Sequence, residues 1–151
     1  MKLHCKRVQT VPEFVDSVRL RVDVFIKEQG FAPGWEPDED DKDAEHFIAL
    51  ADGKVVATAR CREAAKGEFK IERMATRKEM RGRGAATKLL EFMLKDIMKR
   101  NPEKIWLRSQ EQARGFYEKN GFRVMGGPFE VYGKMHVDME YKAIKAGAKS
   151  S

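Results

Sequence analysis

Residues 72–93, "ERMATRKEMRGRGAATKLLEFM", join a strand-like segment to a helix-like one through a loop of glycine, arginine and alanine at 81–86. The first N–H groups of a helix have no partner inside the helix, so together with the helix dipole they attract anions. Glycines let an anion approach the backbone closely. The stretch therefore predicts a strand–loop–helix site for a phosphate or diphosphate, although a tight turn alone remains an alternative for so short a motif.

Two widespread phosphate motifs do not describe this loop. The P-loop requires Gly-Lys followed by Ser or Thr after a longer spacer, and the dinucleotide fingerprint requires a third glycine where Thr87 stands. The loop suits a diphosphate but belongs to neither class.

The flanking sequence predicts a mixed α/β fold. Thr10 and Glu13 form a capping box ahead of a helix at about 11–27, and Asp52-Gly53 is a hairpin signal between two strands. Apolar periodicity predicts a long helix that ends near 101–102 and a short one within 111–121. Strands are expected at 2–8, in two segments of 45–63, and at 68–76, 104–110, 122–126 and 134–141, in the order β-α-β-β-β-α-β-α-β-β.

Composition indicates one soluble, intracellular domain. The chain has 151 residues, of which 42% are hydrophobic, and we expect a domain at 1–142 and a tail at 143–151. No apolar run is long enough for a membrane span, and the N-terminus lacks a signal peptide. The two cysteines have no metal-ligand spacing and are expected to be reduced.

Charge is distributed unevenly. The net charge is +6, yet residues 36–45 hold seven acids and one lysine. These zones suggest an anionic ligand on one side and a cationic group on the other. The acidic run lacks the order of ligands in an EF-hand, so we expect no metal and a solvated loop.

Two motifs resemble the GNAT superfamily of acyl-CoA N-acyltransferases. "RGRGAATKLL" is similar to its coenzyme A pyrophosphate loop, [Q/R]-x-x-G-x-[G/A]. "SQEQARGFYEKNGF" is similar to its N-x-x-A-x-x-x-Y-x-x-x-G-F motif, with Gln110 in place of the usual Asn. Over about 21–139 the chain resembles the ElaA-like branch; its start also resembles acyl-homoserine-lactone synthases, but the well-formed coenzyme A loop argues against these. The matching positions are Arg81, Gly84 and Ala86 in the first motif and Ala113, Tyr117, Gly121 and Phe122 in the second.

The resemblance implies a central mixed, mostly antiparallel sheet flanked by helices. It also implies a cytoplasmic acetyl-CoA-dependent N-acetyltransferase in which a small-molecule primary amine attacks the thioester directly in a ternary complex, without a metal. The residues that it assigns to acetyl-CoA are Met74, Ala75, Thr76, Arg81, Gly82, Arg83, Gly84, Ala85, Ala86, Gln110 and Tyr117.

Two residues are candidates for catalysis. By resemblance, Tyr117 protonates the leaving thiolate; alternatively it packs in an aromatic core beside Phe116. By resemblance, Glu72 is the candidate general base, acting through water two residues before Met74. An apolar neighbourhood would raise the pKa of its carboxyl group toward a useful value; alternatively it pairs with an arginine.

The sequence signals for residues that bind the acceptor are less specific than those for the coenzyme. Glu28 is expected to hold an ammonium group, and His46 and His136 to line the acceptor pocket, each with an ordinary structural role as the alternative. Arg73 belongs to a group of arginines on strands that are able to bind a phosphate group on the acceptor. An amino-sugar phosphate, glucosamine 6-phosphate, is therefore an alternative acceptor. Otherwise these arginines pair with nearby glutamates; the group comprises Arg60, Arg62, Arg73 and Arg108.

A non-catalytic sensor and a nucleic-acid binder are the alternative classes of function. A non-catalytic acyl-CoA sensor would need neither Tyr117 nor Glu72. A nucleic-acid binder is disfavoured because aromatic residues do not alternate with the basic ones. The resemblance also implies a homodimer, since superfamily members often dimerise through their C-terminal strands, and the strand at 134–141 has enough apolar character to allow this.

Overall fold

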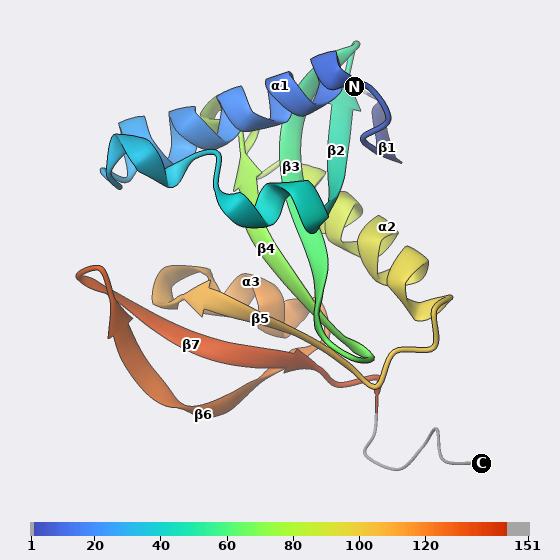
Figure 1. Cartoon of the computed structure of the whole chain (residues 1–151), viewed down its shortest axis with the longest axis vertical. Helices are drawn as coiled ribbons and strands as arrows, with labels where there is room; N and C mark the ends of the chain where they lie inside the picture. The colour runs from blue at the N-terminus through green and yellow to red at the C-terminus, as the bar shows by residue number, and fades with distance from the viewer. Residues whose placement is uncertain (1, 145–151) are drawn as a thin grey trace. The chain divides into compact units, whose positions relative to one another are not determined.

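The computed structural model describes residues 2–144 (Figure 1). The order of strands and α-helices is the predicted one. The strands are β1 (Leu3–Arg7), β2 (Glu45–Ala51), β3 (Lys54–Ala65), β4 (Glu68–Thr76), β5 (Lys104–Gln110), β6 (Phe122–Val131) and β7 (Lys134–Tyr141). The α-helices are α1 (Val11–Arg21), α2 (Ala85–Met98) and α3 (Arg114–Lys119). Shorter helical segments are η1 (Val22–Glu28), η2 (Pro33–Trp35), η3 (Glu39–Asp43), η4 (Lys78–Met80) and η5 (Glu111–Ala113).

The strands follow the order β1-β2-β3-β4-β5-β7-β6 in a mostly antiparallel sheet. β2 pairs with β1 and β3, and β7 with β5 and β6, all antiparallel. β4 and β5 are parallel, because the chain crosses between them through α2. Asp52 and Gly53 both have positive φ in the β2–β3 turn, as the hairpin signal requires. The predicted mixed α/β fold is confirmed.

The described residues form two compact units. The first comprises residues 2–62 and 73–95, and the second comprises 63–72 and 96–144. The single domain at 1–142 stays a prediction, and the predicted tail at 143–151 lies outside the described residues from 145 onward. Within the described part of the chain, no helix is both long and apolar enough to cross a membrane.

In the first unit, the helices at the start of the chain pack on the sheet through one apolar stripe. Leu20 from α1 and Val24 from η1 meet Ile48 from β2, Val55 from β3 and Ala75 from β4. α1 begins at the predicted capping box, in which Thr10 accepts from the backbone of Glu13 and Glu13 accepts from the backbone of Thr10. The predicted helix at 11–27 is a composite, because α1 continues as a π-helix, η1, through Glu28.

In the second unit, β5 and β7 supply several of the buried side chains. Ile105 and Leu107 alternate with solvent-facing residues on β5, and Val137 and Met139 are buried on β7. α3 packs on β6, where Phe122 is 1% exposed.

Candidate functional site

The glycine–arginine loop of the first unit has an open backbone. Gly82 and Gly84 have φ angles of +77° and +83°, a left-handed conformation that other residues rarely adopt. A Cβ on either glycine would meet no described atom within 4 Å. Lys88 donates its backbone N–H to the carbonyl of Gly84 at 3.0 Å, so α2 starts directly after the second glycine. Free N–H groups therefore border open space, as a diphosphate requires.

Arg81 connects this loop to the end of β4 and to η1. Its Nε donates to the carbonyl of Thr76 at 3.1 Å. Its Nη1 and Nη2 donate to the two carboxylate oxygens of Glu28, at 2.5 and 2.7 Å. The hydrogen bonds from Arg81 lower the pKa of Glu28, so the carboxylate is ionised at neutral pH. The structure thus brings together the residue predicted for the coenzyme and the one predicted for the acceptor ammonium.

The end of β4 carries an unusual backbone angle. Arg73 has a φ of +57°, although it is not a glycine and lies within the strand. A non-glycine residue held in a sparsely populated region costs on the order of 1 kcal/mol or more, and such residues concentrate at functional sites. Met74, Ala75 and Thr76, the residues predicted to contact acetyl-CoA, follow it directly.

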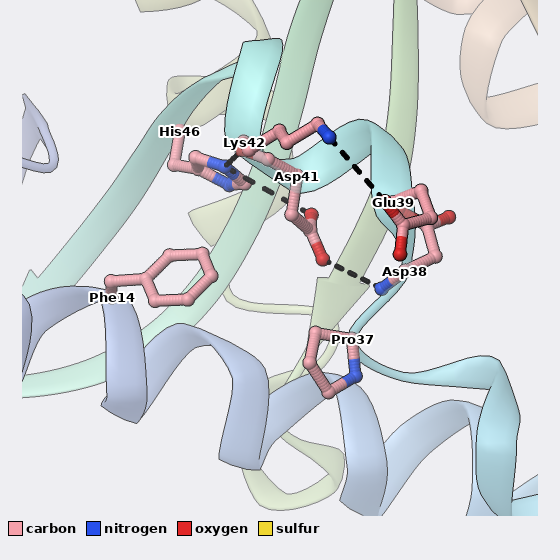
Figure 2. A pocket seen from close by; sticks show the side chains of 7 residues that line it. All are labelled: Phe14, Pro37, Asp38, Glu39, Asp41, Lys42 and His46. Atoms are coloured by element: carbon pink, nitrogen blue, oxygen red, sulfur yellow. Dashed lines mark hydrogen bonds and ion pairs between the residues drawn. The ribbon is translucent and has the colours of Figure 1, made fainter.

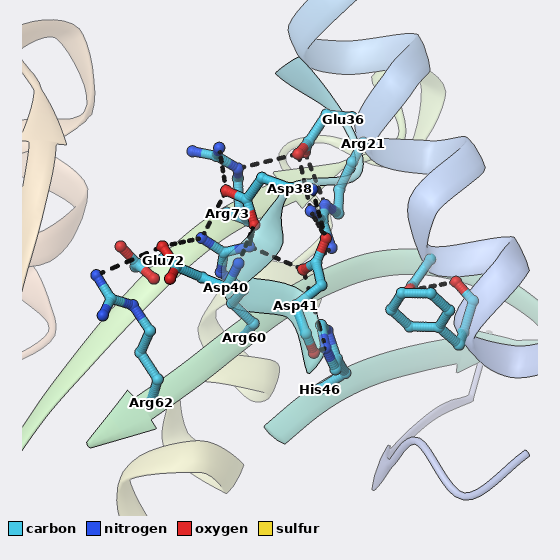
Figure 3. Close-up of polar contacts among 12 residues, drawn as sticks. Arg21, Glu36, Asp38, Asp40, Asp41, His46, Arg60, Arg62, Glu72 and Arg73 are labelled. Atoms are coloured by element: carbon cyan, nitrogen blue, oxygen red, sulfur yellow. Dashed lines mark hydrogen bonds and ion pairs between the residues drawn. The ribbon is translucent and has the colours of Figure 1, made fainter. Parts of the chain in front are cut away.

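A buried charge network lies beside this strand, centred on Arg21 (Figure 3). Arg21 is 1% exposed. It donates to both oxygens of Glu36, at 2.7 and 2.8 Å, and to both oxygens of Asp41, at 2.9 Å each. Burial alone would raise the pKa of Asp41, but hydrogen bonds from Arg21 and Arg60 lower it well below its usual range. The carboxylate of Asp41 therefore remains ionised at neutral pH.

Two strand arginines complete the network. Arg60 donates to Asp38 at 2.6 and 3.0 Å and to Asp41 at 2.8 Å. Arg73 donates from Nε to Glu36 at 3.1 Å and from Nη2 to Asp38 at 2.9 Å. These partners come from the acidic loop, which the sequence analysis did not anticipate.

The expectation of a solvated acidic loop is wrong for Glu36 and Asp41, the two carboxylates that bind Arg21. The side chain of Glu36 is 0% exposed, and Asp41 is also buried, although Glu39 remains in solvent. Three guanidinium groups compensate three carboxylates there, so the carboxylates of Glu36, Asp38 and Asp41 are already paired. Among the described residues, no group of three or more His, Cys, Asp or Glu side chains could hold a metal ion.

His46 lines a pocket of about 480 Å³ in the first unit (Figure 2). Its Nε2–H donates to the carbonyl of Asp41 at 2.9 Å, and its ring meets Phe14 edge-on at 4.9 Å. Burial lowers the pKa of His46, so the imidazole is neutral near pH 7. The other lining residues are Phe14, Pro37, Asp38, Glu39, Asp41 and Lys42.

In the second unit, Tyr117 is buried among aromatic rings. Its ring lies 5.1 Å from Phe116 and 5.9 Å from Phe122, both edge-on. Burial raises the pKa of the Tyr117 hydroxyl, so this group stays protonated across the physiological range. The surroundings suit both the predicted acid, which must carry a proton, and the alternative of aromatic packing.

Glu72, the candidate base, and Arg108 also lie in the second unit. Glu72 forms an ion pair with Lys70 at 3.1 Å, and its side chain is 11% exposed. Arg108 donates to both oxygens of Asp138, at 2.8 and 3.2 Å, and stacks on Phe129. An acceptor phosphate would have to displace Asp138 from Arg108.

His136 and Gln110 are cross-strand partners in the β5–β7 pair. His136 is 8% exposed, and its Nδ1–H donates to the carbonyl of Lys134 at 2.8 Å. Gln110 accepts a hydrogen bond from the side chain of Gln112.

The buried network around Arg21 is the feature that the sequence analysis missed. One signal was present: Arg21 follows Val18 by three residues and precedes Phe25 by four, so it lies on the apolar face of its helix. A charged residue there requires a buried partner of opposite charge. The pattern does not say which of the seven acids at 36–45 provides it.

Most of the chain is similar to proteins of one family. A family model described as an acetyltransferase (GNAT) domain matches residues 15–143. The chain is 31% identical to the uncharacterized N-acetyltransferase YjcF of Bacillus subtilis over 110 residues, which cover 73% of this chain and 78% of that protein. Among solved structures, Escherichia coli ElaA has a TM-score of 0.82 at 23% identity, covering 93% of this chain and 99% of its own. An acyl-CoA N-acyltransferase from Pseudomonas aeruginosa has a TM-score of 0.79 at 24% identity, with the same coverage.

Proposed function

Because the chain belongs to the acetyltransferase (GNAT) family and is therefore an acyltransferase, we propose that it transfers the acetyl group of acetyl-CoA to a primary amine of a small molecule. The observation that carries the proposal is the loop at 81–86. Its two left-handed glycines border open space at the start of α2, and Arg81 and Arg83 add positive charge. A diphosphate needs this combination of free N–H groups, close approach and fixed charge.

The proposed reaction is a direct displacement in a ternary complex. The amine nitrogen attacks the thioester carbon, a C–N bond forms, the C–S bond breaks, and the amine loses a proton. Main-chain groups of Met74 and Thr76 contact the coenzyme arm, and Glu72 takes the proton through water. Tyr117, whose pKa is raised by burial, protonates the departing thiolate. The products are an N-acetylamine and coenzyme A.

We further propose that Glu28, His46 and His136 contribute to amine recognition. Glu28 is the strongest of these candidates, because its pKa is lowered and its carboxylate is about one-third exposed. Such a carboxylate can exchange Arg81 for the ammonium group of an acceptor. A cytoplasmic location accompanies the proposal, because acetyl-CoA is the donor.

Release of free thiol from acetyl-CoA, with the purified protein and a panel of amines, tests the function. The panel includes polyamines, amino acids and glucosamine 6-phosphate, and acetyl-CoA binding is measured in parallel by calorimetry. We expect turnover with one class of amine, identified by mass spectrometry of the acetylated product. Tight binding of acetyl-CoA without turnover on any amine would instead favour the non-catalytic sensor.

A further inference from the structure

Arg73 combines a strained backbone with a fully engaged side chain. Its φ of +57° is in the left-handed region, which a residue with a Cβ leaves unless other contacts hold it there. Strain of this kind persists only where the surrounding structure compensates for it. Contacts of the Arg73 side chain can supply this compensation.

Three consecutive contacts hold the Arg73 guanidinium in place. Nε donates to Glu36, Nη2 donates to Asp38, and Cζ lies over the ring of Trp35, 4.7 Å from the ring centroid. The Trp35 ring is itself stacked on Phe31 at 4.7 Å. Hydrogen bonds on one edge and an aromatic ring on one face restrain both the position and the tilt of the group.

The partners of Arg73 are fixed in turn by other arginines. Arg21 makes two bonds to Glu36, and Arg60 makes two bonds to Asp38. Because Glu36 is buried, water does not readily replace the arginines as hydrogen-bond partners of its carboxylate. Arg73 is thus anchored to carboxylates that other arginines also bind (Figure 3).

The strained residue stands immediately before the main-chain groups proposed to contact acetyl-CoA. A left-handed residue changes the direction of a strand, and with it the directions in which the following N–H and C=O groups point. Met74, Ala75 and Thr76 follow, and the carbonyl of Thr76 is already bonded to Arg81. The path of β4 at residues 74–76 is therefore restrained by the contacts of Arg73 before them and by the bond from Arg81 to Thr76 at their end.

We propose that Arg73 is a positioning residue: the clamp of Trp35, Glu36 and Asp38 on its guanidinium holds the left-handed backbone that directs the main chain of residues 74–76 toward acetyl-CoA. This inference rests on the proposed function for the identity of the ligand. It differs from the expectation that Arg73 binds an acceptor phosphate, because one edge and one face of its guanidinium are already occupied.

Two substitutions at one position separate backbone strain from side-chain charge. Arg73→Ala removes the clamp and also disfavours positive φ, whereas Arg73→Gly removes the clamp but adopts positive φ without strain. By calorimetry we expect acetyl-CoA to bind about tenfold more weakly to Arg73→Ala and to recover to within about threefold of wild type in Arg73→Gly. Equal affinities in the two variants would overturn the proposal, because charge or loop anchoring would then account for the residue.

A second pair of variants approaches the clamp from the loop. We expect Asp38→Asn to weaken acetyl-CoA binding in the wild-type background and to have no further effect when combined with Arg73→Gly. An equal loss in both backgrounds would assign Asp38 a role unrelated to the backbone of Arg73. This pair also decides the matter if Arg73→Ala does not fold.

Amide hydrogen exchange at residues 74–76 tests the positioning without any ligand. Exchange should be faster in Arg73→Ala than in Arg73→Gly, with thermal unfolding of both variants as the control for global stability. If the wild-type protein does not bind acetyl-CoA, the proposed function fails. The difference in exchange between the two variants still decides whether the clamp sets the path of β4, and its absence would refute the positioning role.

Discussion

Glu28 and Arg81 form a two-bond ion pair, with both carboxylate oxygens accepting from the guanidinium at 2.5 and 2.7 Å. The pair joins the last residue of η1 to the first residue of the proposed diphosphate loop. A coenzyme diphosphate and the carboxylate of Glu28 therefore compete for the same guanidinium.

We predict that Glu28→Gln strengthens acetyl-CoA binding by about threefold at low salt, since an exposed pair of this kind contributes up to about 1 kcal/mol. The KM for the amine should rise in the same variant, because the ammonium loses its carboxylate. Calorimetry measures the first effect and steady-state kinetics the second. Asp23→Asn, which removes an exposed pair with Lys27 on the same π-helix, is the matched control and should change neither quantity. Weaker coenzyme binding in Glu28→Gln would show that Glu28 orients Arg81 instead of competing for it.

We predict that Gly84→Ala weakens acetyl-CoA binding by at least about tenfold, because a Cβ beside the free N–H groups blocks a phosphate. Gly53→Ala is the control: both glycines have positive φ, and a Cβ on either meets no described atom within 4 Å. Both variants should lose about 1 kcal/mol of unfolding free energy through backbone strain. Calorimetry and urea denaturation separate the two effects. Equal coenzyme affinities in the two variants would reduce the loop to a structural turn.

The fold could be predicted because its signals are local. The Asp52-Gly53 pair marked the hairpin, the Thr10–Glu13 box marked the start of α1, and a Gly-rich loop marked the step from β4 to α2. Two motifs at the correct spacing predicted the GNAT family, and that prediction is confirmed. The π-helical continuation of α1 and the extension of β6 from residue 126 to Val131 had no counterpart in the sequence pattern.

The charge network could not be predicted in the same way. Arg21 is separated from Glu36 by 15 residues and from Asp41 by 20, and Arg73 is separated from Asp38 by 35. Periodicity and turn signals act over a few residues, so they do not choose partners among a run of acids. The strain at Arg73 was equally hidden, because φ depends on these distant contacts.

We predict that Tyr117→Phe lowers kcat by about a hundredfold, the usual contribution of a positioned general acid. The ring and its contacts with Phe116 and Phe122 are retained, so the midpoint of thermal unfolding should change little. Because burial raises the pKa of Tyr117, wild-type kcat should show no decline from its ionisation below about pH 10. Stopped thiol-release assays across pH measure both effects. An unchanged kcat in the variant would mean that Tyr117 only packs in the aromatic core and does not act as the general acid.

We predict that Arg21→Ala lowers the free energy of unfolding by about 3–5 kcal/mol, because two buried carboxylates each lose the guanidinium that binds both of their oxygens. Arg19→Ala on the same helix removes only an exposed pair with Asp16 and should cost less than about 1 kcal/mol. Urea denaturation of the two variants measures the difference. Similar values would mean that the remaining arginines, Arg60 and Arg73, compensate the acids without Arg21.

Glu13 gives a prediction for acid conditions. Hydrogen bonds from Lys6 and from the backbone of Gln9 and Thr10 lower the pKa of Glu13 from 4.5 to about 2. Since the folded value lies below the unfolded one, the ionised carboxylate contributes stability above about pH 4.5, and this contribution disappears as the pH falls toward 2. Asp41, whose pKa is lowered as well, acts in the same direction.

Glu13→Gln should therefore be less stable than wild type at neutral pH, by about 1 kcal/mol or less because the group is partly exposed. The difference should shrink toward zero as the pH approaches 2, where about half of the wild-type carboxyl groups are protonated and resemble the amide. Urea denaturation of both proteins between pH 2 and 7 measures the two curves. A difference that stays constant over this range would assign the stabilisation to the shape of the capping box, since the charge of Glu13 would then contribute nothing.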